Sequence, residues 1–113
     1  MEVTRLADAQ PYEGPKHFDV STLRLQGYDA SGAETCWVGL SHFLPGGGAG
    51  PDASPTEKVY VVLAGELTVI VGGKETVLEA NDSCFIGPNE EREIINRGND
   101  VCTIVVAMSS PPK

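Results

Sequence analysis

The chain has 113 residues, of which 41% are hydrophobic and 21% are charged, and its formal net charge is −8 at pH 7. This length provides one hydrophobic core, and the composition is that of a globular domain rather than a disordered segment. The acidic balance argues against a nucleic-acid partner and against an anionic membrane surface, because both bind through clustered Lys and Arg.

The N-terminus has no apolar stretch typical of a secretory signal, and no apolar run reaches the roughly 20 residues that span a bilayer. The three cysteines, Cys36, Cys84 and Cys102, are widely spaced and form no CxxC pair. This spacing argues against a zinc knuckle or a disulfide framework. We therefore expect a cytoplasmic protein with three reduced and mostly buried thiols.

Short segments with period-two hydrophobicity predict strands along most of the chain. Residues 5–14 lack a pattern of their own, so we expect them to pack on the outside of the domain or on a partner chain. The predicted strands follow at residues 17–25, 34–44, 58–71, 75–80, 82–87, 92–96 and 101–108. No segment has a sustained helical stripe, so the helix content should be low.

Glycine and proline mark the predicted turns. Gly65 interrupts the strand at 58–71 and predicts a bend or bulge that divides it in two. Gly72 and Gly73 predict a two-residue hairpin, because such turns need a positive φ. The Gly- and Pro-rich segment 45–55 predicts a loop over the surface or over the mouth of a pocket. Many short strands without helices predict a β-sandwich or a β-barrel.

The segment from Gly46 to Gly65 resembles the first motif of the cupin superfamily of small jelly-roll barrels. That motif is a glycine, five residues, His-x-His, three residues, a glutamate, six residues and a glycine. Here Gly46, Asp52, Ser54, Lys58 and Gly65 reproduce the spacing but not the ligands. The resemblance implies an all-β, single-domain cupin barrel of the jelly-roll type with little helix.

Fifteen residues separate Gly65, the end of the first motif, from Asn81, the start of the second motif. Its positions are occupied by Asn81, Gly87, Asn89, Arg92 and Asn96, of which only Asn96 has the residue typical of the family. The resemblance covers roughly residues 38–108. We expect an N-terminal segment with the first strand (1–33), packed on the barrel or a partner, then the barrel core (34–108) and a flexible tail (109–113).

A typical cupin holds a divalent metal with three imidazoles and one carboxylate, whereas this chain offers Asp52, Ser54, Lys58 and Arg92. A hydroxyl is a poor ligand, and two cationic side chains repel a metal ion in a partly desolvated pocket. We therefore expect neither a metal nor another cofactor. The alternative is a metal-dependent oxygenase with displaced ligands, such as His42, Asp52 and a glutamate.

In cupins these positions point into the barrel, and strand alternation extends them to two inward faces. The faces consist of Lys58, Tyr60 and Val62 on one strand and of Arg92, Ile94 and Asn96 on another. One interpretation is that Lys58 and Arg92 pair with Asp52 or with glutamates and plug an unused barrel. We favour the other, a positively charged mouth that binds a small carboxylate, because ligands prefer the mouths of small β-barrels.

Metal-free cupins include epimerases, isomerases and cyclases, which implies an isomerase or lyase here. The resemblance assigns Asp52 as base and Tyr60 as acid, with Lys58 binding substrate or forming a Schiff base. Substrate binding is assigned to Arg92, Lys58, Ser54, Asn96 and His42. The alternative is a non-catalytic small-molecule-binding or accessory cupin with the same pocket. Small cupins commonly pair through sheet edges, which implies a homodimer.

Five side chains are further candidates for the pocket or the core. His42 has a pKa near neutrality that suits acid/base chemistry if it faces the pocket, and His17 is the weaker of the two histidines. Cys84 has no evident neighbour to activate it as a nucleophile. Trp37, like Phe43, is expected in the core or in the pocket lining.

Overall fold

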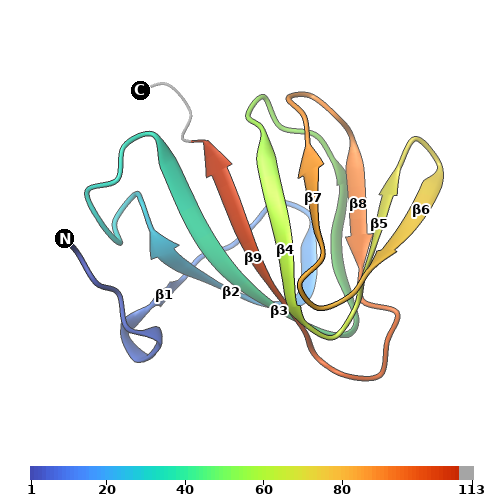
Figure 1. The fold of residues 1–113 in the computed structure, drawn as a ribbon, viewed down its shortest axis with the longest axis horizontal. Coiled ribbons are helices and arrows are strands. Elements are labelled where there is room, and N and C mark those ends of the chain that lie inside the picture. The colour runs from blue at the N-terminus through green and yellow to red at the C-terminus, as the bar shows by residue number, and fades with distance from the viewer. Residues whose placement is uncertain (110–113) are drawn as a thin grey trace.

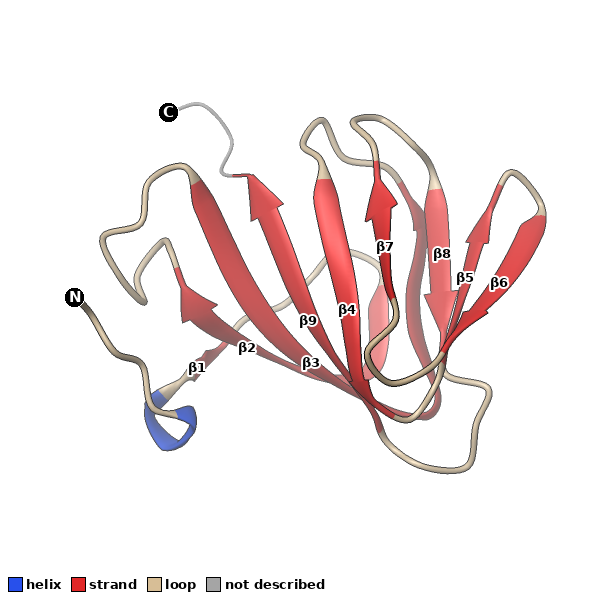
Figure 2. Cartoon of the chain, in the orientation of Figure 1, coloured by secondary structure: helices blue, strands red, loops and turns tan. Residues whose placement is uncertain are grey.

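The computed structural model describes residues 1–109, which form strands almost throughout (Figures 1 and 2). The strands are β1 (Gln10–Pro11), β2 (His17–Gln26), β3 (Cys36–Asp52), β4 (Lys58–Ala64), β5 (Leu67–Val71), β6 (Lys74–Leu78), β7 (Ser83–Ile86), β8 (Arg92–Ile95) and β9 (Cys102–Ser109). One 3-10 turn, η1 (Leu6–Asp8), is the helical element of the described residues. Within that part of the chain no helix is long and apolar enough to cross a membrane.

The strands form one antiparallel sheet that curls into a nearly closed barrel (Figure 1). Its order is β6-β5-β8-β3-β9-β4-β7, while β2 pairs with the other side of β3 and β1 pairs with β2. Strand β3 connects these parts, because residues 36–43 pair with β9 and residues 48–52 pair with β8. The prediction of an all-β barrel with little helix is confirmed.

The prediction of a loop at residues 45–55 is wrong for residues 45–52, because β3 continues to Asp52. A Cβ atom at Gly47 would lie 2.2 Å from the carbonyl oxygen of Asp19, and one at Gly48 would lie 2.3 Å from that of Ile94. These glycines therefore allow β3 to pass close to both neighbouring strands. Between β3 and β4, residues 53–57 lie outside the sheet.

The glycine turns are confirmed. Strand β4 ends just before Gly65, which has a φ of +76°, and β5 begins two residues later. Gly72 and Gly73, with φ of +58° and +77°, form the hairpin between β5 and β6. The predicted strand at 58–71 is thus two strands that pair with different neighbours.

The two ends of the barrel differ in what fills them. At the closed end the side chains of Val62, Leu67 and Cys102 are fully buried. At the open end, β4 begins at Lys58 and β8 begins at Arg92. Strands β4 and β9 connect the two ends. Lys58 pairs with Met108 at the open end, and Val62 pairs with Ile104 nearer the closed end.

The N-terminal segment packs on the edge of β2, on the left of Figure 1. Gln10 pairs with Arg24 in the β1–β2 register, and the backbone N–H of Tyr12 donates to the carbonyl of Thr22 at 3.1 Å. The Thr22 hydroxyl donates to the Tyr12 carbonyl in return. The predicted tail begins at Ser109, which still belongs to β9, and residues 110–113 lie outside the described residues.

Exposed apolar side chains gather on the outer surface of β4 and β7. Val59 and Phe85 are cross-strand partners and are 37% and 59% exposed, and Leu63 on β4 is 46% exposed. This surface is compatible with pairing of two chains. The homodimer stays a prediction.

Candidate functional site

A pocket of about 360 Å³ lies at the open end of the barrel. Side chains from β2, β3, β4, β8 and β9 line it, together with residues 12–15 and 54–56. Its apolar walls include Phe43, Ile94, Ile104 and Val106. A volume of this size is typical of small-molecule sites, which range from about 300 to 1,000 Å³.

The two predicted inward faces are confirmed by burial. Lys58, Tyr60 and Arg92 are 4%, 2% and 5% exposed, and all three line the pocket. Val62 and Ile94 continue the same two faces at 0% and 1% exposed. Strand alternation therefore brings a lysine, a tyrosine and an arginine together at the mouth of an apolar barrel.

Arg92 and Tyr60 form the central polar contact of the pocket. The Arg92 Nε donates to the Tyr60 hydroxyl at 2.7 Å, whereas Arg92 Nη1 is buried and has no hydrogen-bond partner among residues 1–109. Unpaired buried donors are uncommon, since they forgo their hydrogen bonds to water. The pocket thus presents a cationic donor that a ligand acceptor can satisfy.

The interpretation in which Lys58 and Arg92 are neutralised by carboxylates is wrong. Neither side chain forms an ion pair within 4.0 Å in the described part of the chain. Asp52 is opposite Arg92 in the β3–β8 register, yet its carboxylate lies 4.0 Å from the Lys16 ammonium instead. The mouth keeps two cationic side chains with no carboxylate bonded to them.

Burial and the two cations change the proton affinities of this region. Burial lowers the pKa of Lys58, and the Arg92 charge lowers it further against the opposing effect of Asp52. Burial raises the pKa of Tyr60, although the charge and hydrogen bond of Arg92 act in the other direction. Burial is the main cause that lowers the pKa of His17, and the charges of Arg92 and Lys58 lower it further. Tyr60 is therefore a protonated phenol that can donate a proton next to a guanidinium.

Arg24 forms a second cationic wall of the pocket, stacked among aromatic rings. Its guanidinium carbon lies 4.4 Å from the ring centroid of Tyr12, 4.3 Å from that of Tyr28 and 5.1 Å from that of Trp37. Tyr12 and Trp37 meet edge to face, with centroids 5.6 Å apart. Arg24 Nε is buried and has no hydrogen-bond partner among the described residues. The rings hold the guanidinium by cation–π contact and leave that donor unused.

Two predicted site residues do not reach the pocket. Asn96 is fully buried beyond it, and its side chain bonds to backbone groups of the closed end. His42 lies between Ser41 and Phe43 on β3, and those two neighbours line the pocket. Because successive side chains alternate, His42 is directed to the opposite face. The structure therefore does not bring Asn96 and His42 together with the other predicted site residues.

Asp52 and Ser54 lie at the rim of the pocket, as predicted. The Asp52 side chain is 30% exposed, so its carboxylate is accessible to solvent and to a ligand. The Ser54 hydroxyl donates to the carbonyl of Thr56 at 2.9 Å and lies 3.1 Å from the Thr56 hydroxyl. Ser54 therefore shapes the loop at residues 53–57, in addition to lining the pocket.

Several residues of the pocket were not predicted to line it, among them His17, Arg24 and Tyr12. His17 was ranked below His42, yet it lines the cavity. Its position was hidden because the β2–β3 register shifts between Phe18 and Val20, so alternation does not extend across β2. Arg24 follows the buried Thr22 at alternate spacing on β2, which is a signal that sequence reasoning could have used. Tyr12 lies outside every predicted strand and gave no signal.

The cysteines provide no activated thiol. Burial raises the pKa of Cys84, and it raises the pKa of Cys102 to about 11. All three thiols are free, as predicted, but Cys36 is exposed because it begins β3 at a barrel end. The expectation of mostly buried thiols is wrong for that residue.

A nine-stranded antiparallel barrel with an apolar pocket that has a few polar side chains at its mouth is the architecture of a small β-barrel binding protein or enzyme. The sequence profile of the cupin domain family (Cupin_2) matches residues 39–108. The chain belongs to the cupin family, as its motif spacing predicts.

Over 111 residues the chain is 46% identical to a protein of Mycobacterium tuberculosis (strain ATCC 25618 / H37Rv) named Beta-D-galactosidase Rv1717, covering 98% of this chain and 96% of that protein. Similar solved structures include the polyketide cyclase RemF from Streptomyces resistomycificus, with a TM-score of 0.85, 18% identity and coverage of 99% and 82%. Another is a predicted oxalate decarboxylase from Thermotoga maritima, with a TM-score of 0.81, 22% identity and coverage of 98% and 100%. At these identities the two structures establish the fold alone.

The residues at the cupin metal positions do not fit a divalent cation. Within residues 1–109 no group of three His, Cys, Asp or Glu side chains is placed to hold a metal ion. Lys58 and Arg92 bring positive charge to the pocket, which repels a cation. The unpaired Arg92 Nη1 is a hydrogen-bond donor, so it can bind an acceptor but not a metal ion. A displaced site that uses His42 is wrong as well, because His42 faces away from Asp52 and the pocket.

Proposed function

We propose that the protein is a metal-independent cupin hydrolase that cleaves β-D-galactosides in the barrel pocket. The observation that carries the proposal is the 46% identity, over nearly the whole chain, to a protein named as a β-D-galactosidase. The pocket supports it with a volume of about 360 Å³, aromatic surfaces from Tyr12 and Trp37, and donors from Lys58 and Arg92. Aromatic faces and directed hydrogen-bond donors together suit a ring that is apolar on its faces and polar at its edge.

Hydrolysis of a glycoside needs one group that protonates the leaving oxygen and one that activates water. We assign Tyr60 as the acid and Asp52 as the base. Asp52 takes a proton from water, the water oxygen bonds to the anomeric carbon, the bond to the leaving oxygen breaks, and that oxygen takes the Tyr60 proton. The Arg92 Nε, 2.7 Å from the Tyr60 hydroxyl, stabilises the phenolate that forms. Glu13, the other carboxylate of the pocket, is exposed at its rim.

The test is hydrolysis of 4-nitrophenyl β-D-galactoside by untagged protein in the presence of a chelator. We expect turnover, and we expect Tyr60→Phe and Asp52→Asn to lower kcat by about 10²- to 10⁴-fold. Glu57→Gln is the matched control, because Glu57 is exposed beside the pocket loop and does not line the cavity. The proposal fails if Tyr60→Phe hydrolyses the substrate at the wild-type rate, or if no β-galactoside is cleaved. Stoichiometric iron, manganese, nickel or zinc in elemental analysis of the purified protein would overturn metal independence.

A second candidate function is binding of a small carboxylate, with or without isomerase or lyase activity. The observation that favours it is the buried, unpaired Nη1 of Arg92 in the same pocket as Lys58, which forms no ion pair within the described residues. A carboxylate bonded to Arg92 would satisfy that donor, and Asp52 with Tyr60 would move a proton beside a carbonyl. Without turnover, the same pocket serves a binding or accessory cupin.

Thermal-shift screening of small carboxylates separates these possibilities. We expect a ligand of this class to raise the melting temperature of the wild type and not that of Arg92→Ala. If Tyr60→Phe and Asp52→Asn keep that affinity and no turnover occurs, the binding role is supported. If no carboxylate shifts the wild type, the second candidate is rejected while the hydrolase proposal is unaffected.

A further inference from the structure

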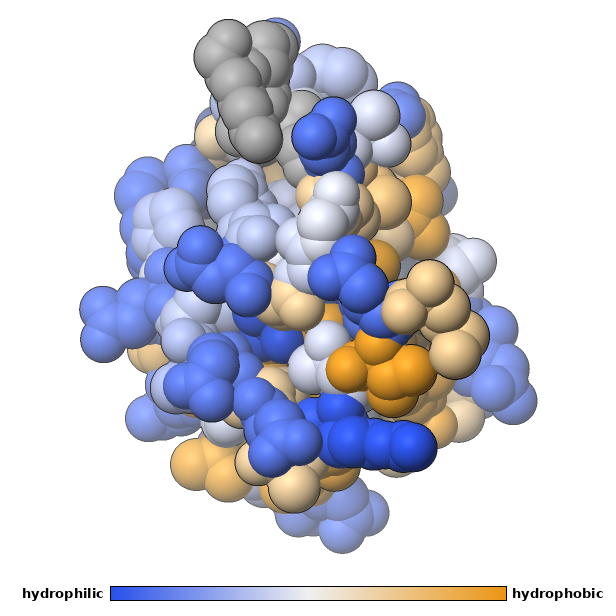
Figure 3. Space-filling view, turned by 90° about the vertical axis from the view of Figure 1, so that its left-hand side faces the viewer, coloured by the Kyte–Doolittle hydropathy of each residue, from blue (hydrophilic) through white to orange (hydrophobic). Residues whose placement is uncertain are grey.

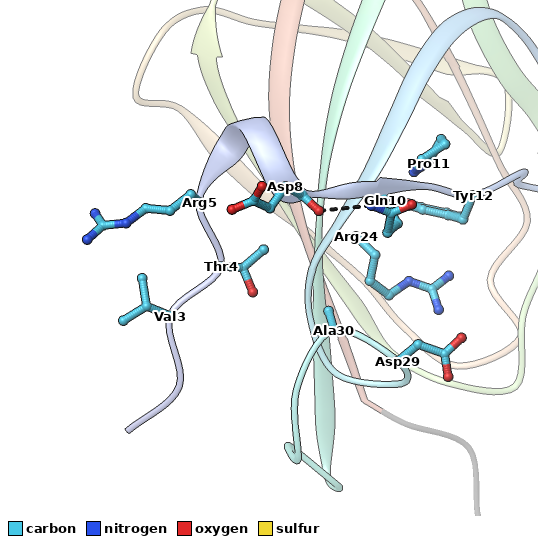
Figure 4. A pocket seen from close by; sticks show the side chains of 10 residues that line it. All are labelled: Val3, Thr4, Arg5, Asp8, Gln10, Pro11, Tyr12, Arg24, Asp29 and Ala30. Atoms are coloured by element: carbon cyan, nitrogen blue, oxygen red, sulfur yellow. Dashed lines mark hydrogen bonds between the residues drawn. The ribbon is translucent and has the colours of Figure 1, made fainter.

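A groove lies beside the pocket, between the N-terminal segment and the turn after β2 (Figure 4). Its volume is about 330 Å³, close to that of the barrel pocket. Tyr12 and Arg24 line both cavities, so the two spaces meet at these side chains. The remaining polar lining of the groove comes from Thr4, Arg5, Asp8, Gln10 and Asp29.

We propose that this groove is a second sugar subsite, so that the substrate is a glycan of at least two units. The galactosyl unit occupies the barrel pocket, and the next unit lies in the groove on the other side of Tyr12 and Arg24. This inference rests on the proposed hydrolase function and specifies its substrate class.

The groove is preformed, because several hydrogen bonds hold the N-terminal segment in place. The backbone N–H of Gly32 donates to the Glu2 carboxylate at 2.9 Å, and the Gln26 amide donates to the Thr4 hydroxyl at 3.4 Å. Strand β1 adds the Gln10–Arg24 pair at the floor. A cavity whose walls are already ordered loses little conformational entropy on binding.

The groove also has unused hydrogen-bonding capacity. The Gln10 amide nitrogen donates to the carbonyl of Asp8 at 3.1 Å, the dashed line in Figure 4, which leaves its amide oxygen to accept from a ligand. The Asp29 carboxylate makes no side-chain hydrogen bond or ion pair within residues 1–109, and Figure 4 shows it next to Arg24 in the lining. Acceptors of this kind bind hydroxyl groups.

The charges of the groove favour a neutral, hydroxyl-rich occupant. The groove is lined by two cations, Arg5 and Arg24, and two carboxylates, Asp8 and Asp29, whereas the barrel pocket is lined by three cations and two carboxylates. The side of the molecule on which the N-terminal segment lies is mostly hydrophilic, with a smaller hydrophobic area to one side (Figure 3). An anion or an apolar group would leave the carboxylates of Asp8 and Asp29 without hydrogen-bond donors. The hydroxyl groups of a sugar unit can bond to the carboxylates and to the arginines.

Arg24 connects the two subsites. Its guanidinium carbon lies within 4.4 Å of the ring centroids of Tyr12 and Tyr28, so cation–π contacts hold the side chain between the cavities. Its Nε and the Nη1 of Arg92 are the buried side-chain atoms that have no hydrogen-bond partner among the described residues, and both arginines line the barrel pocket. A ligand that extends from Arg92 past Arg24 would offer oxygens to both.

The test compares one-unit and two-unit substrates, 4-nitrophenyl β-D-galactoside and 4-nitrophenyl β-galactobioside, and measures binding of galactobiose by calorimetry. We expect the two-unit substrate to have a KM about tenfold lower, which corresponds to one or two net hydrogen bonds. Asp29→Asn and Gln10→Ala should remove most of this advantage. The matched control is Glu34→Gln, an exposed carboxylate near Asp29 that lines neither cavity, and it should leave the advantage intact.

The outcomes separate this inference from the function on which it rests. Hydrolysis of both substrates with equal KM values, unaffected by Asp29→Asn, overturns the second subsite and leaves the hydrolase proposal standing. Galactobiose binding that is weakened by Asp29→Asn, without hydrolysis of either substrate, supports the subsite and overturns the hydrolase. Absence of both binding and hydrolysis overturns both.

Discussion

Asn96 and Arg92 lie on the same inward face of the barrel, four residues apart, and only one of them has all its hydrogen bonds. At the closed end, the Asn96 amide donates to the carbonyls of Phe43 at 3.0 Å and Asp100 at 2.8 Å, and its oxygen accepts from the N–H of Gly98 at 2.9 Å. At the open end, Arg92 keeps a buried Nη1 without a partner among residues 1–109. The comparison separates a polar group that stabilises the barrel from one that is available to a ligand.

The difference has an energetic meaning. A buried hydrogen bond contributes about 1 kcal/mol, whereas a buried group left unpaired costs about 1–3 kcal/mol. Replacing Asn96 should therefore destabilise the fold. Replacing Arg92 should change function more than stability.

The largest effect is expected for Asn96→Ala. The variant loses three hydrogen bonds of a fully buried side chain, so the free energy of unfolding should fall by about 3 kcal/mol. Urea denaturation followed by circular dichroism measures this loss. Asn99→Ala, at an exposed neighbouring position, is the control and should unfold like the wild type. A loss below about 1 kcal/mol in Asn96→Ala would contradict this account of the closed end.

At the open end we expect a loss of function without a loss of stability. The double variant Tyr60→Phe/Arg92→Met removes both members of a buried polar pair, so neither group is left unpaired. We expect its free energy of unfolding to stay within about 1 kcal/mol of the wild type or to increase, while ligand binding and turnover are lost. The same urea titration and the galactoside assay decide this. A large destabilisation would show that the pair is structural.

The free energy of unfolding should also change with pH. This effect is smaller, and its direction follows from the lowered pKa of Lys58. The pKa of Lys58 is lowered in the folded state from its ordinary value of 10.5, so the unfolded chain binds more protons between the two values. Stability contributed by this group therefore rises as the pH increases through that window. The raised pKa of Tyr60 acts above its ordinary value of 10.0, where it makes stability fall.

The measurement is the free energy of unfolding from about pH 7 to about pH 9.5, below the range in which Tyr60 titrates. The wild type should become more stable relative to Lys58→Met across this range. Parallel curves for the two proteins would show that the folded state does not disfavour the Lys58 charge.

The smallest effect is expected far from both ends, at the surface pair of Arg97 and Glu75. Their two contacts, at 2.6 and 2.9 Å, join side chains that are about half exposed. Exposed ion pairs of this kind add little to stability because water and salt screen them. Glu75→Gln should have the wild-type unfolding midpoint in high salt, and a clear shift there would show that this pair stabilises the barrel.

The sequence predicted the barrel and the inward faces because both depend on local alternation and motif spacing. Lys58, Tyr60 and Arg92 were placed in the pocket in this way. Contacts between distant segments could not be predicted. The continuation of β3 through residues 45–52 depends on close approach to Asp19 and Ile94, and the position of Tyr12 depends on pairing of a short strand that has no pattern.

The same limit applies at Asn96. Its place on an inward face was correct, but alternation does not say at which end of the barrel a residue lies. The bonds to Phe43, Gly98 and Asp100 appear only when the chain closes on itself. Facing inward is thus a local property, whereas lining a pocket is a property of the whole fold.

Trp37 is the single tryptophan of the chain. It is 8% exposed, lines the barrel pocket, packs against Tyr12 and lies 5.1 Å from the Arg24 guanidinium. Indole emission responds to nearby charge and to water, so the native protein has a built-in fluorescent reporter at the junction of the two cavities. A ligand that settles against Arg24 will change the intensity or wavelength of that emission, and titrations can be read without a label.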